Sequence, residues 1–273
     1  LSAASSPCPD LNLIHYKMER EEVVWKRSFN RVQNQKKSSK GNIMNYQDFI
    51  SQTETQYGIS LPNLYKRLAA DGMLDWGELG SKWYSETFPK LLEYPPLLLV
   101  GSEFELPHAD ELQGINKQLC DDSEWMSLKP EYRGKLIAFA GAGNGDYYAF
   151  DYRQEGEPCI THLYHDDDFS VVEAANLADF IFRRLLQAQA DYFPEEDTSP
   201  EDYRRQLFAQ LESHRPYLSA EQYEFLRQTY QKPYQKDQWG GLFMLSDEET
   251  SATEQRFISC ERLDEEFEPF DYD

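Results

Sequence analysis

The 273 residues are 40% hydrophobic and 14% aromatic, so the chain has enough apolar material for a sizeable core and is not expected to be disordered. It carries 27 Lys and Arg against 49 Asp and Glu, a formal net charge of −22 at pH 7. A field of this sign repels nucleic acid and anionic lipid, which argues against both as direct partners, and it favours rapid association with a basic protein.

Charge is distributed unevenly along the chain. Residues 1–43 hold eight Lys and Arg against four Asp and Glu, which leaves 19 against 45 for residues 44–273. The polar stretch NQKKSSKGN (Asn34–Asn42) is typical of a linker, and Met44 stands shortly after it. We therefore expect the main domain to begin at residue 44, and we treat residues 1–43 as a basic N-terminal extension or linker without an assigned role.

Cysteine usage and hydropathy indicate the compartment. The four cysteines, Cys8, Cys120, Cys159 and Cys260, are far apart and form no CxxC pair, which favours reduced thiols over a disulfide framework. The apolar run YPPLLLV is far too short for a membrane span, and the N-terminus lacks the apolar core of a signal peptide. These patterns predict a cytoplasmic protein.

The main domain is predicted to start with two short helices. Apolar residues recur at helical spacing after Asn45, and Gly58 is a typical C-terminal glycine. Pro62 suits the start of the second helix because its φ is fixed and it lacks an N–H. Asp71–Trp83 is predicted to be a glycine-punctuated aromatic loop, and Pro95–Leu106 a strand with an acidic continuation.

The strongest β signal lies in the middle of the chain. Three runs rich in β-forming residues, Leu136–Ala140, Asp146–Tyr152 and Pro158–Tyr164, are joined by the short segments GAGNG and RQEGE. Connections this short force neighbouring strands to be antiparallel, so a meander is predicted.

The segment GAGNG raises the alternative of a phosphate-binding loop. Such a loop needs a helix after its glycines, whereas here a strand follows, and no Lys-Ser or Lys-Thr pair is present. Gly and Asn tolerate the positive φ of a tight reversal, so a hairpin is favoured. Asp146 is expected to accept backbone N–H bonds from the loop, which is a structural role.

Helices dominate the predicted C-terminal part. An amphipathic helix is predicted from about Val172 to Ala190. Ser199 and Ser219 are typical N-caps of two further helices. The chain ends in an acidic, aromatic tail (Leu263–Asp273), which could instead add a strand to the sheet of its own chain.

The order of these segments, rather than one motif, resembles the SUKH superfamily. LIAFAGAGNGDYYAFD, GEPCITHLYHDD and a helix containing LADFIFRRLL follow one another as in the core of that family. FISQTETQYGISLPNLYKRL resembles its first helix, with Glu54 in the acidic position, and DGMLDWGELGSKW resembles a bacterial branch. The resemblance spans Tyr46–Gln189.

The resemblance implies an α+β domain over residues 44–192, in which helices pack against a curved antiparallel β-sheet. It also implies the absence of catalytic chemistry. The family includes a fungal regulator of cell-wall synthesis and many bacterial immunity proteins, which bind and silence a cognate secreted toxin, often a nuclease. Residues 193–273 lie outside the resemblance and form a C-terminal helical extension with an acidic tail.

Acidic segments with aromatic neighbours are the candidate partner-binding residues, since such anchors suit a basic partner. DDSE, HDDD, PEED (Pro194–Asp197) and the tail can each be merely solvated, but together with the net charge one of them is expected to form the partner face. The candidates are Asp121, Asp122, Glu124, Trp125, Asp166, Asp167, Asp168, Phe169, Phe270 and Tyr272.

Features of the sequence also raise three other functions. His162 and His165 beside Asp166–Asp168 give this segment the density of metal-binding side chains that a metal site has. Positions 162 and 165 face opposite sides of an extended strand, however, so a strand-end role is favoured. No metal or cofactor is expected. A hydrolase is disfavoured, because G-x-S-x-G, H-E-x-x-H and a Cys next to a His are absent from the sequence. A regulatory scaffold like the fungal relative is the alternative to an immunity protein.

Overall fold

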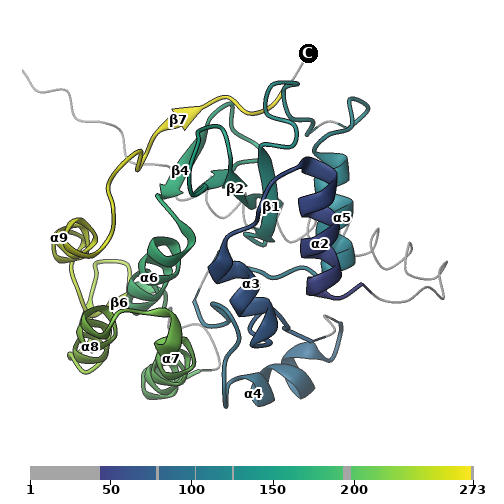
Figure 1. The fold of residues 1–273 in the computed structure, drawn as a ribbon. Helices are drawn as coiled ribbons and strands as arrows, with labels where there is room; N and C mark the ends of the chain where they lie inside the picture. Colours follow the sequence, from purple (N-terminus) through teal and green to yellow (C-terminus); the bar gives the residue numbers. More distant parts are fainter. Residues whose placement is uncertain (1–43, 78–79, 102, 125, 193–197, 272–273) are drawn as a thin grey trace, which may run out of the picture.

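A computed structural model of the chain describes residues 44–77, 80–101, 103–124, 126–192 and 198–271. A five-stranded antiparallel sheet lies at the centre, and helices pack beside and below it in the view of Figure 1. The predicted α+β class is thus confirmed. Among the described residues, no helix combines the length and the apolar character that a membrane span requires.

The sheet is built from the predicted meander. Its strands, in the spatial order β1-β2-β3-β4-β7, are β1 Leu136–Gly141, β2 Tyr147–Asp151, β3 Cys159–Leu163, β4 Ser170–Ala174 and β7 Glu266–Phe267. Bulges between Ala138 and Ala140 and between Ile160 and Thr161 interrupt the register, and such bulges bend strands. The final strand β7 comes from the C-terminal tail, as one of the two expectations for that segment predicted.

The β1–β2 connection is a hairpin, as predicted. Gly143 and Gly145 have φ of +77° and +113°, and Ala142 donates its N–H to the carbonyl of Asp146 at 3.0 Å. A side chain at either glycine would be strained in this conformation. The glycines therefore serve the reversal of the chain.

Both predicted N-terminal helices are present. The helices of this part are α2 Tyr46–Tyr57, α3 Asn63–Ala70, α4 Phe88–Leu91 and α5 Ala109–Gln118, with a π-helical turn η1 Trp83–Thr87 before α4. Asn45 caps α2, Gly58 ends it at φ +66°, and α3 follows Pro62. Helix α5 occupies a segment for which no helix was predicted; its first turn is closed by Glu111, which accepts the N–H of His108 at 3.1 Å.

The prediction of a strand over Pro95–Leu106 was wrong. The run Leu97–Val100 is buried as expected, but its backbone turns, and Leu98 has a φ of +50°. Two side chains of α7 take the place of a neighbouring strand. Gln210 exchanges two hydrogen bonds of 2.7 Å with the N–H and the carbonyl of Val100, and Nε2 of His214 accepts the N–H of Leu98 at 3.1 Å.

The predicted helix from Val172 begins later. Residues Ser170–Ala174 form β4, with alternating burial along the strand, and α6 covers Leu177–Gln187, followed by the 3₁₀ turn η2 Ala188–Ala190. The side chain of Asn176 caps α6 by accepting the N–H of Asp179 at 2.9 Å. A strand and a helix thus share the segment that was expected to be one helix.

The C-terminal helices pack beside α6. They are α7 Pro200–His214, η3 Arg215–Tyr217, α8 Ala220–Thr229 and α9 Asp247–Phe257, with a small hairpin of β5 Gln235–Lys236 and β6 Leu242–Phe243. Ser199 and Ser219 cap α7 and α8 as predicted. Helix α9 was not predicted; it packs against α6 and leads to β7.

Two cores stabilise the sheet, one on each face. The larger core lies between the sheet and helices α2, α3 and α6, where the rings of Phe139 and Phe150 stack at 4.3 Å. The smaller core lies on the other face and includes Leu128, Leu163, Phe267 and Phe270. Because Phe267 and Phe270 belong to the tail, the C-terminal segment covers part of this second face.

Candidate functional site

The first predicted acidic segment is the loop after α5. Asp121 and Asp122 are exposed, and Glu124 is half-buried. Asp121 accepts the N–H and the hydroxyl of Ser123 at 3.0 and 2.8 Å, and these hydrogen bonds lower the pKa of its carboxyl. The carboxylate of Asp122 is 82% exposed and pairs with Arg133. The candidate Trp125 lies outside the described residues.

The tail lies against the segment that follows this acidic loop. Lys129 donates its N–H to the carbonyl of Pro269 at 2.9 Å, and its ammonium lies 3.0 Å from the Glu268 carboxylate. Phe270 forms a β-bridge with Leu128 and is only 2% exposed. Phe270 therefore packs in the second core and offers a partner no surface while the tail is in place. Tyr272 lies outside the described residues.

The remaining candidates form the turn between β3 and β4. Asp166, Asp167, Asp168 and Phe169 are all exposed, and 45% of the Phe169 surface is accessible. Ser170 follows at once and pairs with Phe267 of β7. The tail thus starts beside this turn and runs to Ser127–Lys129, the segment that follows the acidic loop. PEED lies outside the described residues.

Asp146 connects the hairpin loop with the β3–β4 turn. Its carboxylate accepts the backbone N–H of His165 at 2.8 Å and the amide of Asn144 at 2.8 Å, and it lies 2.6 Å from Nδ1 of His165. Burial alone would raise the pKa of Asp146, but its contacts with His162, His165 and Asn144 hold that pKa well below its usual range. The structural role expected for Asp146 is thus present, with the β3–β4 turn rather than the glycine loop as backbone donor.

A polar chain continues from Asp146 into the helices. Nε2 of His162 lies 3.3 Å from the Asp146 carboxylate, and its Nδ1 lies 3.8 Å from the Glu173 carboxylate. Burial lowers the pKa of His162, and the two carboxylates outweigh that effect and raise it. Arg183 bridges Glu173 and Glu254 at 2.6 and 2.9 Å, which ties β4 to α6 and α9.

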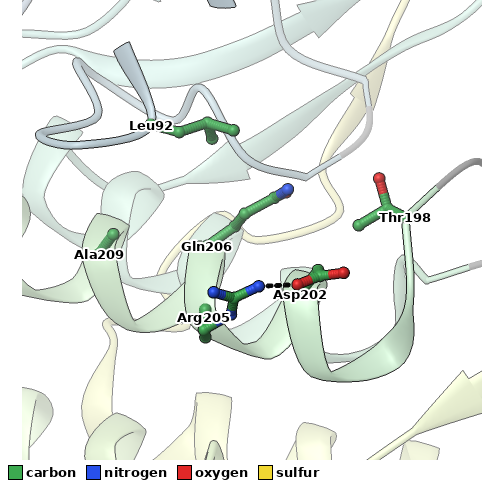
Figure 2. A pocket seen from close by; sticks show the side chains of 6 residues that line it. All are labelled: Leu92, Thr198, Asp202, Arg205, Gln206 and Ala209. Carbon is green, nitrogen blue, oxygen red and sulfur yellow. Dashed lines mark ion pairs between the residues drawn. The ribbon is translucent and has the colours of Figure 1, made fainter. Parts of the chain in front are cut away.

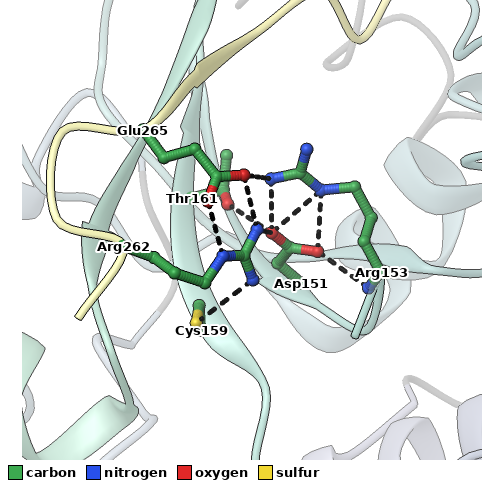
Figure 3. A network of polar contacts seen from close by, with 6 residues as sticks. All are labelled: Asp151, Arg153, Cys159, Thr161, Arg262 and Glu265. Carbon is green, nitrogen blue, oxygen red and sulfur yellow. Dashed lines mark hydrogen bonds and ion pairs between the residues drawn. The ribbon is translucent and has the colours of Figure 1, made fainter. Parts of the chain in front are cut away.

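A second polar network fixes the tail to the sheet (Figure 3). The side chain of Asp151 at the end of β2 is completely buried and accepts bonds of 2.8–3.0 Å from the guanidinium of Arg153. Arg262 lies 3.5 Å from the same carboxylate and pairs with Glu265 at 2.7 Å. Sequence reasoning missed this network, because nothing near Arg262 points to a partner 111 residues away.

A surface hollow beside α7 has no evident chemistry. It measures about 540 Å³, is open to solvent, and is lined by Leu92, Thr198, Asp202, Arg205, Gln206 and Ala209 (Figure 2). Asp202 and Arg205 neutralise each other in an ion pair. Its lining includes neither an imidazole nor a thiol.

The comparison with known families agrees with this architecture. The SMI1 / KNR4 family (SUKH-1) matches residues 47–183, half of the chain, which covers the helices from α2 to most of α6 and the strands β1–β4. No curated protein and no solved structure matches the chain. The domain boundaries at residues 44 and 192 stay predictions. By this match, the chain belongs to the SMI1/KNR4 (SUKH-1) family.

Proposed function

We propose that the protein is an immunity protein, which binds a cognate basic secreted toxin in the cytoplasm and blocks its active or substrate-binding surface. A nuclease is the toxin class that this proposal favours, because a nuclease domain needs Lys and Arg for the phosphates of its substrate. The observation that carries the proposal is the exposure of two acidic segments, the loop Asp121–Glu124 and the turn Asp166–Phe169, in a chain of this family with a net charge of −22.

The proposed binding surface has three parts: the loop Asp121–Glu124, the turn Asp166–Phe169 and the tail segment between them. Exposed carboxylates in the loop and the turn supply negative charge, and Phe169 supplies an apolar contact. Lys129 and Arg133 hold Glu268 and Asp122 in place, so part of the surface is pre-ordered. Pre-ordered side chains lose less conformational entropy when a partner binds.

Inhibition by this surface requires no chemical step. Complementary charge speeds the encounter with a basic protein, and occupation of the substrate groove is enough to stop the toxin. We propose that the protein acts stoichiometrically and turns over no substrate. Inhibition that is complete at one protein per toxin supports this, whereas inhibition by far less than one equivalent contradicts it.

The experiment pairs two variants that remove the same charge. Asp167→Asn/Asp168→Asn changes the β3–β4 turn, and Glu155→Gln/Glu157→Gln changes exposed acids in the β2–β3 loop at the opposite end of the sheet. Each is co-expressed with the toxins encoded beside its gene, and growth is measured. The first variant is expected to protect less than the wild type and the second to protect equally. The proposal fails if the wild type relieves none of these toxins.

A regulatory scaffold is the second candidate. It is favoured by exposed aromatic residues outside the acidic surface, namely Trp239 at the tip of the β5–β6 hairpin, which is 73% exposed, and Tyr94 after α4. Such residues suit additional protein contacts. Co-purification separates the two functions: one basic partner at equal stoichiometry indicates an immunity protein, and several substoichiometric partners indicate a scaffold.

A further inference from the structure

Three side chains with metal-binding atoms converge where the β1–β2 hairpin meets the β3–β4 turn. One ligand atom each from Asp146, His165 and Asp166 lies within 4.8 Å of the others. Asp146 is buried, His165 is half-buried and Asp166 is exposed, so the cluster reaches from the protein interior to solvent. It joins two loops that are 20 residues apart in the sequence.

A buried imidazole next to the cluster gives an independent indication. His162 is 6% exposed, and its Nε2 makes no hydrogen bond although it lies 3.3 Å from the Asp146 carboxylate. A buried polar atom without a hydrogen bond costs roughly 1–3 kcal/mol, so an unsatisfied nitrogen at this place calls for an explanation. A metal ion next to Asp146 would accept its lone pair.

The other nitrogen of His162 is oriented by a carboxylate. Its Nδ1 lies 3.8 Å from Glu173, and Arg183 holds that carboxylate at 2.6 Å. Metal-binding histidines commonly direct their second nitrogen toward a carboxylate, which fixes the ring and its tautomer. The chain from Arg183 through Glu173 to His162 has this arrangement.

We propose that Asp146, His165 and Asp166 bind one divalent transition-metal ion, and that Nε2 of His162, which lies outside this close group but 3.3 Å from the Asp146 carboxylate, moves in as a fourth donor. Imidazole nitrogen combined with carboxylate oxygen suits Zn²⁺ and neighbouring first-row ions, whereas Ca²⁺ and Mg²⁺ prefer oxygen alone. The imidazole rings of His162 and His165 do not face apart as expected. His165 lies beyond the end of β3, and both imidazoles reach Asp146.

Metal binding would replace a proton. Nδ1 of His165 lies 2.6 Å from Oδ1 of Asp146, the spacing of a shared hydrogen. A metal between these atoms takes that position and separates them to a distance set by two bonds of about 2.0–2.2 Å. Asp166 lies on an exposed turn and can adjust to this change. The ion would fasten the turn to the hairpin, and this inference does not depend on the proposed toxin partner.

The test uses the full chain without a histidine tag, freed of metal by a chelator. Zn²⁺ is titrated by calorimetry, and Co²⁺ by its visible absorption, which reports the ligands directly. His165→Gln and Asp166→Asn remove proposed ligands, and His108→Gln and Asp168→Asn are the matched controls. Asp166 is exposed, so Asp166→Asn tests a ligand without disturbing the core.

We expect one ion per chain in the wild type and in both controls. The affinity should fall at least about tenfold in His165→Gln and Asp166→Asn, because loss of one donor removes a metal bond. Circular dichroism is used to show that each variant is folded. The inference is overturned if the wild type binds neither ion, or if Asp166→Asn and His165→Gln bind as tightly as the controls.

Discussion

Replacing Asp151 by Asn is expected to detach the C-terminal tail from the sheet and to destabilise the whole protein. The Asp151 carboxylate is completely buried and neutralises Arg153 directly, with Arg262 at 3.5 Å. Asn keeps the shape of the side chain but removes the negative charge, so two largely buried guanidinium groups then share Glu265 alone. The tail loses its electrostatic link to β2.

The magnitude follows from the burial of the three groups. Breaking a buried ion pair by removing one partner typically costs about 3–5 kcal/mol, because the remaining charge stays desolvated. Both guanidinium groups keep Glu265 as a partner, so we expect about 3 kcal/mol rather than more. Arg153 also stacks on Phe267 of β7 at 3.4 Å, so its displacement weakens the strand directly.

Urea unfolding measures the free-energy change, and hydrogen exchange locates it. The N–H of Val172, which bonds to Glu265, and the N–H of Asp264, which bonds to Val172, should exchange faster in Asp151→Asn than in the wild type. The amides between β1 and β2 serve as internal controls. A loss below about 1 kcal/mol with unchanged exchange at β4 would refute the reasoning that this network holds the tail.

Three further predictions concern stability. Burial lowers the pKa of His214 to about 4 in the folded protein, below its unfolded value near 6.5, so stability is full above pH 6.5 and falls as the pH drops toward 4. Between pH 7 and pH 5 this group should account for a loss of roughly 2 kcal/mol in the free energy of unfolding, measured with urea. An unchanged pH dependence in His214→Gln would contradict this. Gln210→Leu leaves the N–H and the carbonyl of Val100 without their partner and should cost about 2–4 kcal/mol by the same assay; a neutral effect would count against α7 as the support of the turn around Leu98. Phe270→Ala should cost about 3 kcal/mol, since it empties part of the second core, and a loss near zero would show that the tail contributes little to folding.

The local elements could be read from the sequence because their causes are local. Asn45 and Gly58 delimit α2, Ser199 and Ser219 start α7 and α8, and the glycines of the hairpin supply positive φ. Each of these signals acts within a few residues of the chain. The meander followed in the same way from its short connections.

The errors come from interactions between distant segments. Leu97–Val100 has the composition of a strand, but Gln210 and His214, more than 100 residues away, satisfy its backbone and hold it in turns. Val172 was placed at the start of an amphipathic helix, yet its backbone bonds in the sheet to Asp264 and Glu265 of the tail. Local patterns carry no information on partners this far apart.

The candidate site was predictable only in part. Exposure of Asp166–Phe169 follows from their position in a turn. Phe270 was expected to be a contact residue because aromatic side chains among acids suit interfaces, but the same side chain also suits a core, and the structure buries it. The convergence of Asp146 with His162 and His165 depends on the antiparallel register, which sets the ends of β1–β2 and β3–β4 side by side.

The central claim is that the protein works by placing an acidic surface on a basic toxin. The most direct measurement is the association rate with the toxin encoded beside its gene, followed by surface plasmon resonance at increasing salt. The account predicts a one-to-one complex whose association slows as salt rises and in Asp167→Asn/Asp168→Asn, but not in Glu155→Gln/Glu157→Gln. A complex with the same association rate at every salt concentration and in both variants would contradict it.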